Sequence, residues 1–66
     1  MRITLNGEPR ELDQGTTLAG LMRALTGSGR GSAAVVDGEV VPRREWDGYT
    51  LRDGQHLELI TAVQGG

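Results

Sequence analysis

The stretch RITLNGEPRELDQGTTLAGLMRALTG, residues 2–27, changes its hydrophobic period partway along and thereby decides the fold. Near its start, Ile3 and Leu5 alternate with polar residues, which is the period of a half-buried strand. Asn6-Gly7 follows, and this dipeptide favours a type I′ turn because both residues tolerate positive φ. The beginning of the stretch therefore predicts a two-stranded hairpin.

After the turn, the same stretch predicts an edge strand and then a helix. Pro9 has no N–H for a neighbouring strand, so the second strand should lie at the edge of a sheet. Apolar residues then recur at i, i+3, i+4 and i+7, which predicts a helix of about ten residues. Thr16 or Thr17 can cap its first amides, and Gly27 can end it in a left-handed conformation. The apolar stripe consists of Leu18, Leu21, Met22 and Leu25.

Downstream of the helix the sequence predicts a loop and further strands. The glycine-rich residues 27–32 follow a helix and precede a strand, the opposite order to a phosphate-binding loop. Asp37-Gly38 is a second hairpin signal, and Pro42 should end the pairing after it. A short helical turn near Glu45-Trp46 and a short strand at residues 49–51 are expected before a final strand at residues 56–63.

This order of elements predicts an α+β fold with a mixed sheet of four to five strands and one main helix across one face. Parallel pairing of the last strand with the first, between two edge strands, would bury their apolar residues under the helix. That topology is the β-grasp, or ubiquitin-like, fold, and the helix makes a Greek-key barrel a weaker alternative. We expect residues 1–63 to form this domain and residues 64–66 to form a flexible C-terminal Gly-Gly tail.

The composition excludes several classes of function. The 66 residues allow one domain, and a net charge of −2 without a basic segment argues against nucleic acid as a partner. No apolar run reaches the roughly 18 residues of a membrane span, and the N-terminus lacks a signal-peptide pattern. The absence of cysteine excludes disulfides and a thiolate nucleophile. We therefore expect a cytoplasmic protein with no metal site and no membrane partner.

Candidate catalytic residues are few. His56 is the single histidine and is expected to lie on the surface at the start of a strand. Ser28 and Ser32 have no base nearby in the sequence, and the nine carboxylates show no spacing that suggests acid–base chemistry. We therefore expect a chain that is not an enzyme and binds no cofactor of its own.

The remaining candidate group is the α-carboxylate of Gly66, in the closing residues ITAVQGG. A free carboxylate lacks a good leaving group, but a partner enzyme that uses ATP can convert it to an acyl-adenylate. Glycines have no Cβ and fit a narrow channel. Counted from Val63, the last four residues reach roughly 13 Å, so Gln64, Gly65 and Gly66 can enter a neighbouring active site.

Two motifs carry a resemblance to a known family. The segments VDGEVVPRREW, residues 36–46, and LRDGQHLELITAVQGG, residues 51–66, resemble the sulfur carrier proteins of thiamine biosynthesis. The first strand and the helix fit as well, so the resemblance covers nearly the whole chain. Gln55 departs from the family, which often has Asp there, and the loop at residues 27–32 is longer than expected.

The resemblance implies a β-grasp fold and a role as a protein co-substrate. In such a family, an adenylyltransferase of the ubiquitin-activating type uses ATP and Mg²⁺ to adenylate the terminal glycine, here Gly66. Sulfur that originates from cysteine, often through a cysteine desulfurase, then replaces AMP to give a thiocarboxylate. Thiazole synthase uses that sulfur to build the thiazole ring of thiamine.

Three alternatives remain open at this point. A molybdopterin-synthase small subunit also carries a thiocarboxylate, although the motif VVPRREW and the short length favour the thiamine carrier. A ubiquitin-like protein modifier is the second alternative, and the absence of lysine means that it cannot form chains on its own side chains. The third is an interaction domain in which the final glycines have no function.

A candidate docking surface lies beside the tail. Ile60 and Ala62 should face away from the helix, so we expect an apolar patch there, continuing to Val63, that docks both partner enzymes. The alternative for Ile60 is that it completes a second small core. Arg43 is a further candidate contact for acidic partner residues, whereas Trp46 is expected to be a packing residue.

Overall fold

The structure, a computed structural model, describes residues 1–27 and 31–61. The predicted tail at residues 64–66, together with Ala62 and Val63, lies outside the described residues. The first part of the chain forms β1 (Arg2–Leu5), β2 (Glu8–Glu11) and α1 (Leu18–Thr26). The second part forms β3 (Ser32–Val36), β4 (Glu39–Val41), the 3₁₀ helix η1 (Arg43–Gly48) and β5 (His56–Thr61).

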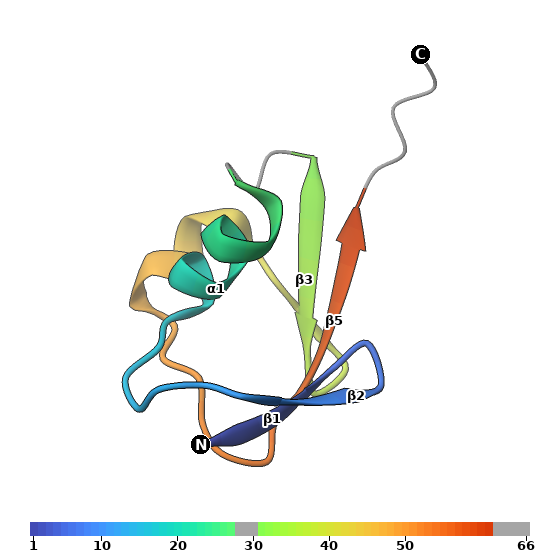
Figure 1. The fold of residues 1–66 in the computed structure, drawn as a ribbon. Helices are drawn as coiled ribbons and strands as arrows, with labels where there is room; N and C mark the ends of the chain where they lie inside the picture. The colour runs from blue at the N-terminus through green and yellow to red at the C-terminus, as the bar shows by residue number, and fades with distance from the viewer. Residues whose placement is uncertain (28–30, 62–66) are drawn as a thin grey trace.

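The strands form one mixed sheet in the order β2-β1-β5-β3-β4. β5 is central and runs parallel to β1, whereas the β1–β2, β3–β4 and β3–β5 pairs are antiparallel. Figure 1 shows α1 on one side of the long β3–β5 pair, with the β1–β2 hairpin crossing near the start of β5. This arrangement confirms the predicted β-grasp fold, with β2 and β4 at the two edges.

The short strand expected at residues 49–51 is the element that the structure does not form as predicted. Thr50 makes a single isolated bridge with Thr17, outside the sheet. The Leu18 N–H donates to the Tyr49 carbonyl at 2.8 Å, and the Leu51 N–H donates to the Thr16 carbonyl at 2.9 Å. This segment therefore pairs with the residues that lead into α1, and a single bridged pair is too short to form a strand.

The core lies between α1 and the sheet. Its central strands are β1 and β5, whose inward residues meet the predicted stripe of α1, although Leu25 and Leu59 are only partly buried. Trp46 is 4% exposed and confirms its expected packing role. The buried apolar side chains are Ile3, Leu5, Leu18, Leu21, Met22, Ala34, Val36, Val41, Trp46, Leu51 and Leu57.

Both ends of α1 follow the predicted capping chemistry. Thr17 is the N-cap, and its side-chain oxygen accepts a hydrogen bond from the Gly20 N–H at 3.1 Å. Gly27 has φ 79° and ψ −81° at the C-cap, so the predicted positive φ is present, whereas the negative ψ differs from the left-handed helical conformation. The Gly27 N–H donates to the Arg23 carbonyl, which satisfies one of the last carbonyls of the helix. Local sequence thus fixes where this helix begins and ends.

The two predicted hairpin turns also hold the central strand. Asn6 and Asp37 have φ values of 50° and 49°, and the glycine after each also has positive φ, as a type I′ turn requires. Asn6 Oδ1 accepts a hydrogen bond from the Leu59 N–H at 2.9 Å. Asp37 Oδ1 accepts one from the His56 N–H at the same distance. The turn side chains therefore bind β5 from its two sides.

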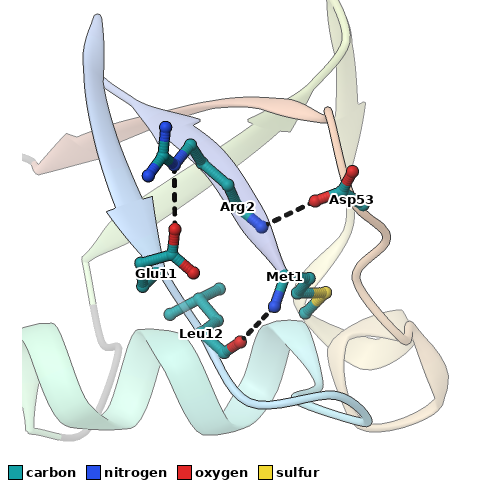
Figure 2. Close-up of polar contacts among 5 residues, drawn as sticks. All are labelled: Met1, Arg2, Glu11, Leu12 and Asp53. Atoms are coloured by element: carbon teal, nitrogen blue, oxygen red, sulfur yellow. Dashed lines mark hydrogen bonds and ion pairs between the residues drawn. The ribbon is translucent and has the colours of Figure 1, made fainter.

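The N-terminal residues tie the first hairpin to the loop before β5 (Figure 2). The Met1 ammonium donates to the Leu12 carbonyl at 2.8 Å. The Arg2 N–H donates to Asp53 Oδ1 at 2.7 Å, and Arg2 Nε donates to Glu11 Oε1 at 2.8 Å. These contacts place the start of β1 beside the turn from which β5 begins.

Candidate functional site

Strand β5 connects the folded body to the predicted reactive end of the chain. It is the middle strand of the sheet and is held on both sides, so its direction is fixed by the whole domain. The last described residue is Thr61, and Gly66 follows it by five residues along the chain. We call residues 60–63, which join β5 to the predicted tail, the root. Of the predicted root and tail residues, Ala62, Val63, Gln64 and Gly65 also lie outside the described part. The structure therefore places the root of the candidate site at the end of β5.

The sheet face opposite α1 carries an apolar patch next to that root. Ile60 is 55% exposed and Val40 is 68% exposed. Across the strands, Ile60 lies opposite Ala33, and Val40 lies opposite Val35. Their chain neighbours Leu59 and Val41 point to the core side, so these four residues share the outer face. We call Ala33, Val35, Val40 and Ile60 the open-face patch.

The exposure of Ile60 excludes one of the two sequence interpretations of this residue, whereas its contact with a partner stays a prediction. A side chain that completed a second core would be buried, and Ile60 is more than half exposed. Sequence reasoning found Ile60 but missed Val40, Val35 and Ala33 as its neighbours. The turn at Asp37-Gly38 fixes the register of the β3–β4 hairpin, but residues 33–36 form a continuous apolar run, so the sequence did not mark which of them face outward. The sequence also did not predict that β3 pairs with β5, and this long-range pairing is what brings Ala33 and Val35 beside Ile60.

Arg43 lies on a different surface from Ile60. Its guanidinium carbon is 5.9 Å from the centroid of the Trp46 ring, at the start of η1. The Trp46 Nε1–H donates to the Val41 carbonyl at 2.8 Å, which fixes the ring that Arg43 covers. A hollow of about 140 Å³ beside it is lined by residues of α1 and η1. The lining residues are Ala19, Met22, Arg23, Arg43, Trp46 and Asp47.

This hollow is not a good candidate for a substrate pocket. Ligand pockets usually occupy roughly 300 to 1,000 Å³, and the hollow at η1 is smaller. In the described ranges 1–27 and 31–61, no three His, Cys, Asp or Glu side chains lie close enough to hold a metal ion. His56 is exposed at the first position of β5, as predicted. The geometry of the described residues thus directs attention to the end of β5 and the open-face patch.

No helix in the described part of the chain is both long and apolar enough to cross a membrane.

Comparison with known proteins identifies the relatives of this chain. Residues 3–66 match the sequence profile of the ThiS family. The sulfur carrier protein ThiS of Escherichia coli K12 is 27% identical over 66 residues, which are 100% of this chain and 100% of that protein. A thiazole synthase of Magnetococcus marinus is 33% identical over 66 residues, which are 100% of this chain and 20% of that enzyme.

Solved structures agree with the sequence comparisons. The crystal structure of a thiamine biosynthesis protein (ThiS) from Geobacter metallireducens has a TM-score of 0.83 at 29% identity, covering 100% of both chains. The solution structure of a thiamine biosynthesis protein from the same organism has a TM-score of 0.81 at 29% identity, covering 100% of this chain and 88% of that one. Among the alternatives that the sequence left open, the profile match selects the thiamine carrier, and the chain belongs to the ThiS family.

Proposed function

We propose that Gly66 is the residue at which this sulfur carrier of thiamine biosynthesis holds its sulfur. The observation that carries the proposal is the end-to-end match with the Escherichia coli sulfur carrier, which spans all 66 residues of this chain. The match to the family profile likewise runs to residue 66.

The chemistry proceeds in two steps on partner enzymes. An adenylyltransferase of the ubiquitin-activating type, using ATP and Mg²⁺, forms a bond between the Gly66 carboxylate and the α-phosphorus, and pyrophosphate leaves. In the second step a desulfurase supplies sulfur from cysteine as a persulfide, whose outer sulfur attacks the carbonyl carbon while the bond to AMP breaks. A thiol reductant then cleaves the resulting acyl disulfide, supplying two electrons and leaving in a disulfide, and a thiocarboxylate remains on Gly66. Thiazole synthase takes the sulfur. In this proposal the chain is a cytoplasmic co-substrate that performs no catalytic step and binds no cofactor.

The body must be held while Gln64, Gly65 and Gly66 enter a partner's active site. The open-face patch suits this task because it presents two exposed apolar side chains, Val40 and Ile60, with half-buried Ala33 and Val35 on the same face, and apolar exposure of this kind is typical of protein interfaces. Ile60 is next to the root, so a partner bound on the patch is already close to the tail. Ala62 and Val63 would extend the same contact, and Arg43 would add a separate contact on the η1 side.

Thiazole synthase is supported as a partner by one of the relatives. The Magnetococcus marinus enzyme contains a region 33% identical to this whole chain within its own polypeptide. A carrier-like region joined to a synthase is expected where the two must meet in each reaction cycle, because a covalent link raises their effective concentration.

Mass spectrometry of the intact protein tests the proposal. The chain is incubated with the adenylyltransferase of its own organism, ATP, Mg²⁺ and a sulfur source that includes the desulfurase. We expect a mass increase that matches replacement of one oxygen by sulfur. Deletion of Gly66 should abolish it, whereas Ala24→Glu, at an exposed position of α1, should retain it. The proposal is wrong if the chain without Gly66 gains the same mass.

A further inference from the structure

The two sides of β5 are covered to different extents. On one side β3 pairs with it along nearly its whole length, from Val36 opposite Leu57 to Ser32 opposite Thr61. On the other side β1 pairs only with its beginning, and the last match is Leu5 opposite Leu57. In Figure 1 the β1–β2 hairpin turns away from β5, whose final residues continue beside β3 alone. The end of the central strand is therefore an edge.

Specific backbone groups face this open side. The Asn6 N–H donates to the Leu57 carbonyl, and Asn6 Oδ1 accepts the Leu59 N–H, both at 2.9 Å. Because successive residues of a strand direct their backbone groups to alternate sides, the next groups on this side are the Leu59 carbonyl and the Thr61 N–H. Within residues 1–27 and 31–61, no strand pairs with β5 beyond the side chain of Asn6 on that side. Thr61 is also exposed to solvent.

The glycine-rich tail suggests how a partner would recognise this end of the chain. Gly65 and Gly66 have no side chains, so a partner that recognises the tail must bind mainly its backbone. Addition of a strand to a sheet edge is the general way in which proteins bind an extended backbone. A strand laid along the edge at Leu59 and Thr61 would pair with the last described residues before the chain continues toward Gly66.

We propose that an extended segment of thiazole synthase pairs with the open edge of β5 at Leu59–Thr61 and guides the tail into the synthase active site. This inference rests on the proposed function, since it concerns how the sulfur-bearing end is presented. Thiazole synthase is the chosen partner because a relative of that name contains this domain within its own chain. The edge is distinct from the open-face patch, because backbone groups lie in the plane of the sheet whereas Ile60 stands perpendicular to it.

Amide hydrogen exchange by NMR tests the pairing directly on the full chain. In the free protein the Thr61 amide should exchange rapidly, and in the complex with thiazole synthase its exchange should slow by about tenfold or more, as expected for a backbone hydrogen bond removed from water. The Ile60 amide, which points to β3, serves as the internal control and should be protected in both states. Rapid exchange of the Thr61 amide in the saturated complex would overturn the proposal.

A pair of variants measures the contribution of the Thr61 N–H. Thr61→Pro removes this donor at a position where the sheet does not use it, and Thr61→Val keeps the donor while removing the hydroxyl. We expect Thr61→Pro to bind the synthase about tenfold more weakly and Thr61→Val to bind like the wild type. Equal affinities, or a loss in Thr61→Val alone, would contradict the edge pairing. Proline can also bend the chain. If Thr61→Pro unfolds, the amide exchange of the wild-type protein alone tests the proposal.

The outcomes separate this inference from the proposed function. Thiocarboxylate formation is measured by intact mass in the same variants. If Thr61→Pro gains sulfur normally and still binds the synthase like the wild type, the edge pairing is wrong and the carrier function stands. If the wild type gains no sulfur, the carrier function fails, whereas the exchange data still report on the edge. If the Thr61 amide exchanges more slowly in the complex with the adenylyltransferase but not in the complex with the synthase, the edge binds the adenylyltransferase. That result would overturn the proposal.

Discussion

At the residue scale, Asn6 has two structural roles, and the local sequence predicts only the first of them. The backbone task is the left-handed conformation of a type I′ turn, which the dipeptide Asn6-Gly7 predicts. The side-chain task is to accept the Leu59 N–H, 53 positions away in the sequence. Asp37 repeats this pattern with His56. Each turn therefore supplies a backbone bend and also a hydrogen-bond acceptor for the central strand.

Replacement of Asn6 separates the two tasks. Asn6→Gly keeps the left-handed turn but removes the acceptor for Leu59, so we expect a loss of about 1 kcal/mol in the free energy of unfolding. Asn6→Asp retains a side-chain oxygen at the same place and should cost less. Urea denaturation of the two variants and the wild type measures the difference. If Asn6→Asp is as unstable as Asn6→Gly, the hydrogen bond to Leu59 is not the cause.

At the element scale, the sheet has one face covered by α1 and one face that carries the open-face patch. The same strands supply both faces, because successive side chains alternate across a strand. On β5, Leu57 is buried in the core while Ile60 is more than half exposed. A single strand thus contributes to stability through one set of side chains and remains available to a partner through the other.

A charge on the open-face patch should weaken partner binding without unfolding the domain. We expect Ile60→Glu to reduce affinity for the adenylyltransferase and for thiazole synthase by about tenfold or more, because it buries a carboxylate in an apolar contact. Ala24→Glu adds the same charge at an exposed position of α1, on the opposite side of the sheet, and should bind like the wild type. Calorimetric titration measures affinity, and circular dichroism confirms folding.

Two results would contradict this interpretation of the patch. Unchanged affinity of Ile60→Glu for both partners would remove Ile60 from the interface. Equal weakening by Ile60→Glu and Ala24→Glu would indicate a general effect of negative charge and not a contact at the patch. Val40→Glu adds a second position on the patch and should weaken binding in the same direction as Ile60→Glu.

At the scale of the whole molecule, a 66-residue domain has a small core and depends on contacts between distant segments. The contacts around Arg2 are of this kind, since Asp53 follows it by 51 positions (Figure 2). The ion pair between Arg2 and Glu11 is of a different kind, with side chains 69% and 67% exposed. An exposed pair contributes little, whereas a carboxylate that accepts a backbone N–H fixes the chain itself.

Removal of the two carboxylates should therefore have unequal effects. We expect Asp53→Ala to lower the free energy of unfolding by about 1 kcal/mol or more, because the Arg2 N–H loses its partner. Glu11→Ala should lower it by less than about 0.5 kcal/mol, and that small loss should vanish at high salt. Denaturation at two salt concentrations measures both effects. A larger loss for Glu11→Ala would contradict this ranking.

Much of the fold was predictable because its signals are local. The two turn dipeptides, the apolar stripe of α1 with its caps, and the edge position of the Pro9 strand all act within a few residues. The strand predicted at residues 49–51 was wrong for the opposite reason. Its alternation is real, but its partners are Thr16 and Leu18 near the start of α1, and no local rule selects them.

The sequence by itself determined all the elements except the strand expected at residues 49–51, and it determined the burial of their apolar faces. It also carried the family resemblance, which the comparisons confirm. Gly66 as the site of sulfur attachment stays a prediction from sequence. Only the tertiary structure decided which exposed residues lie together. Val40 and Ile60 lie on the sheet face opposite α1, whereas Arg43 lies beside Trp46 in η1. Among the described residues, no strand pairs with β5 at Thr61 on the β1 side. The physical reason is that turns and helices arise from neighbouring residues, whereas a surface arises from pairing between distant strands.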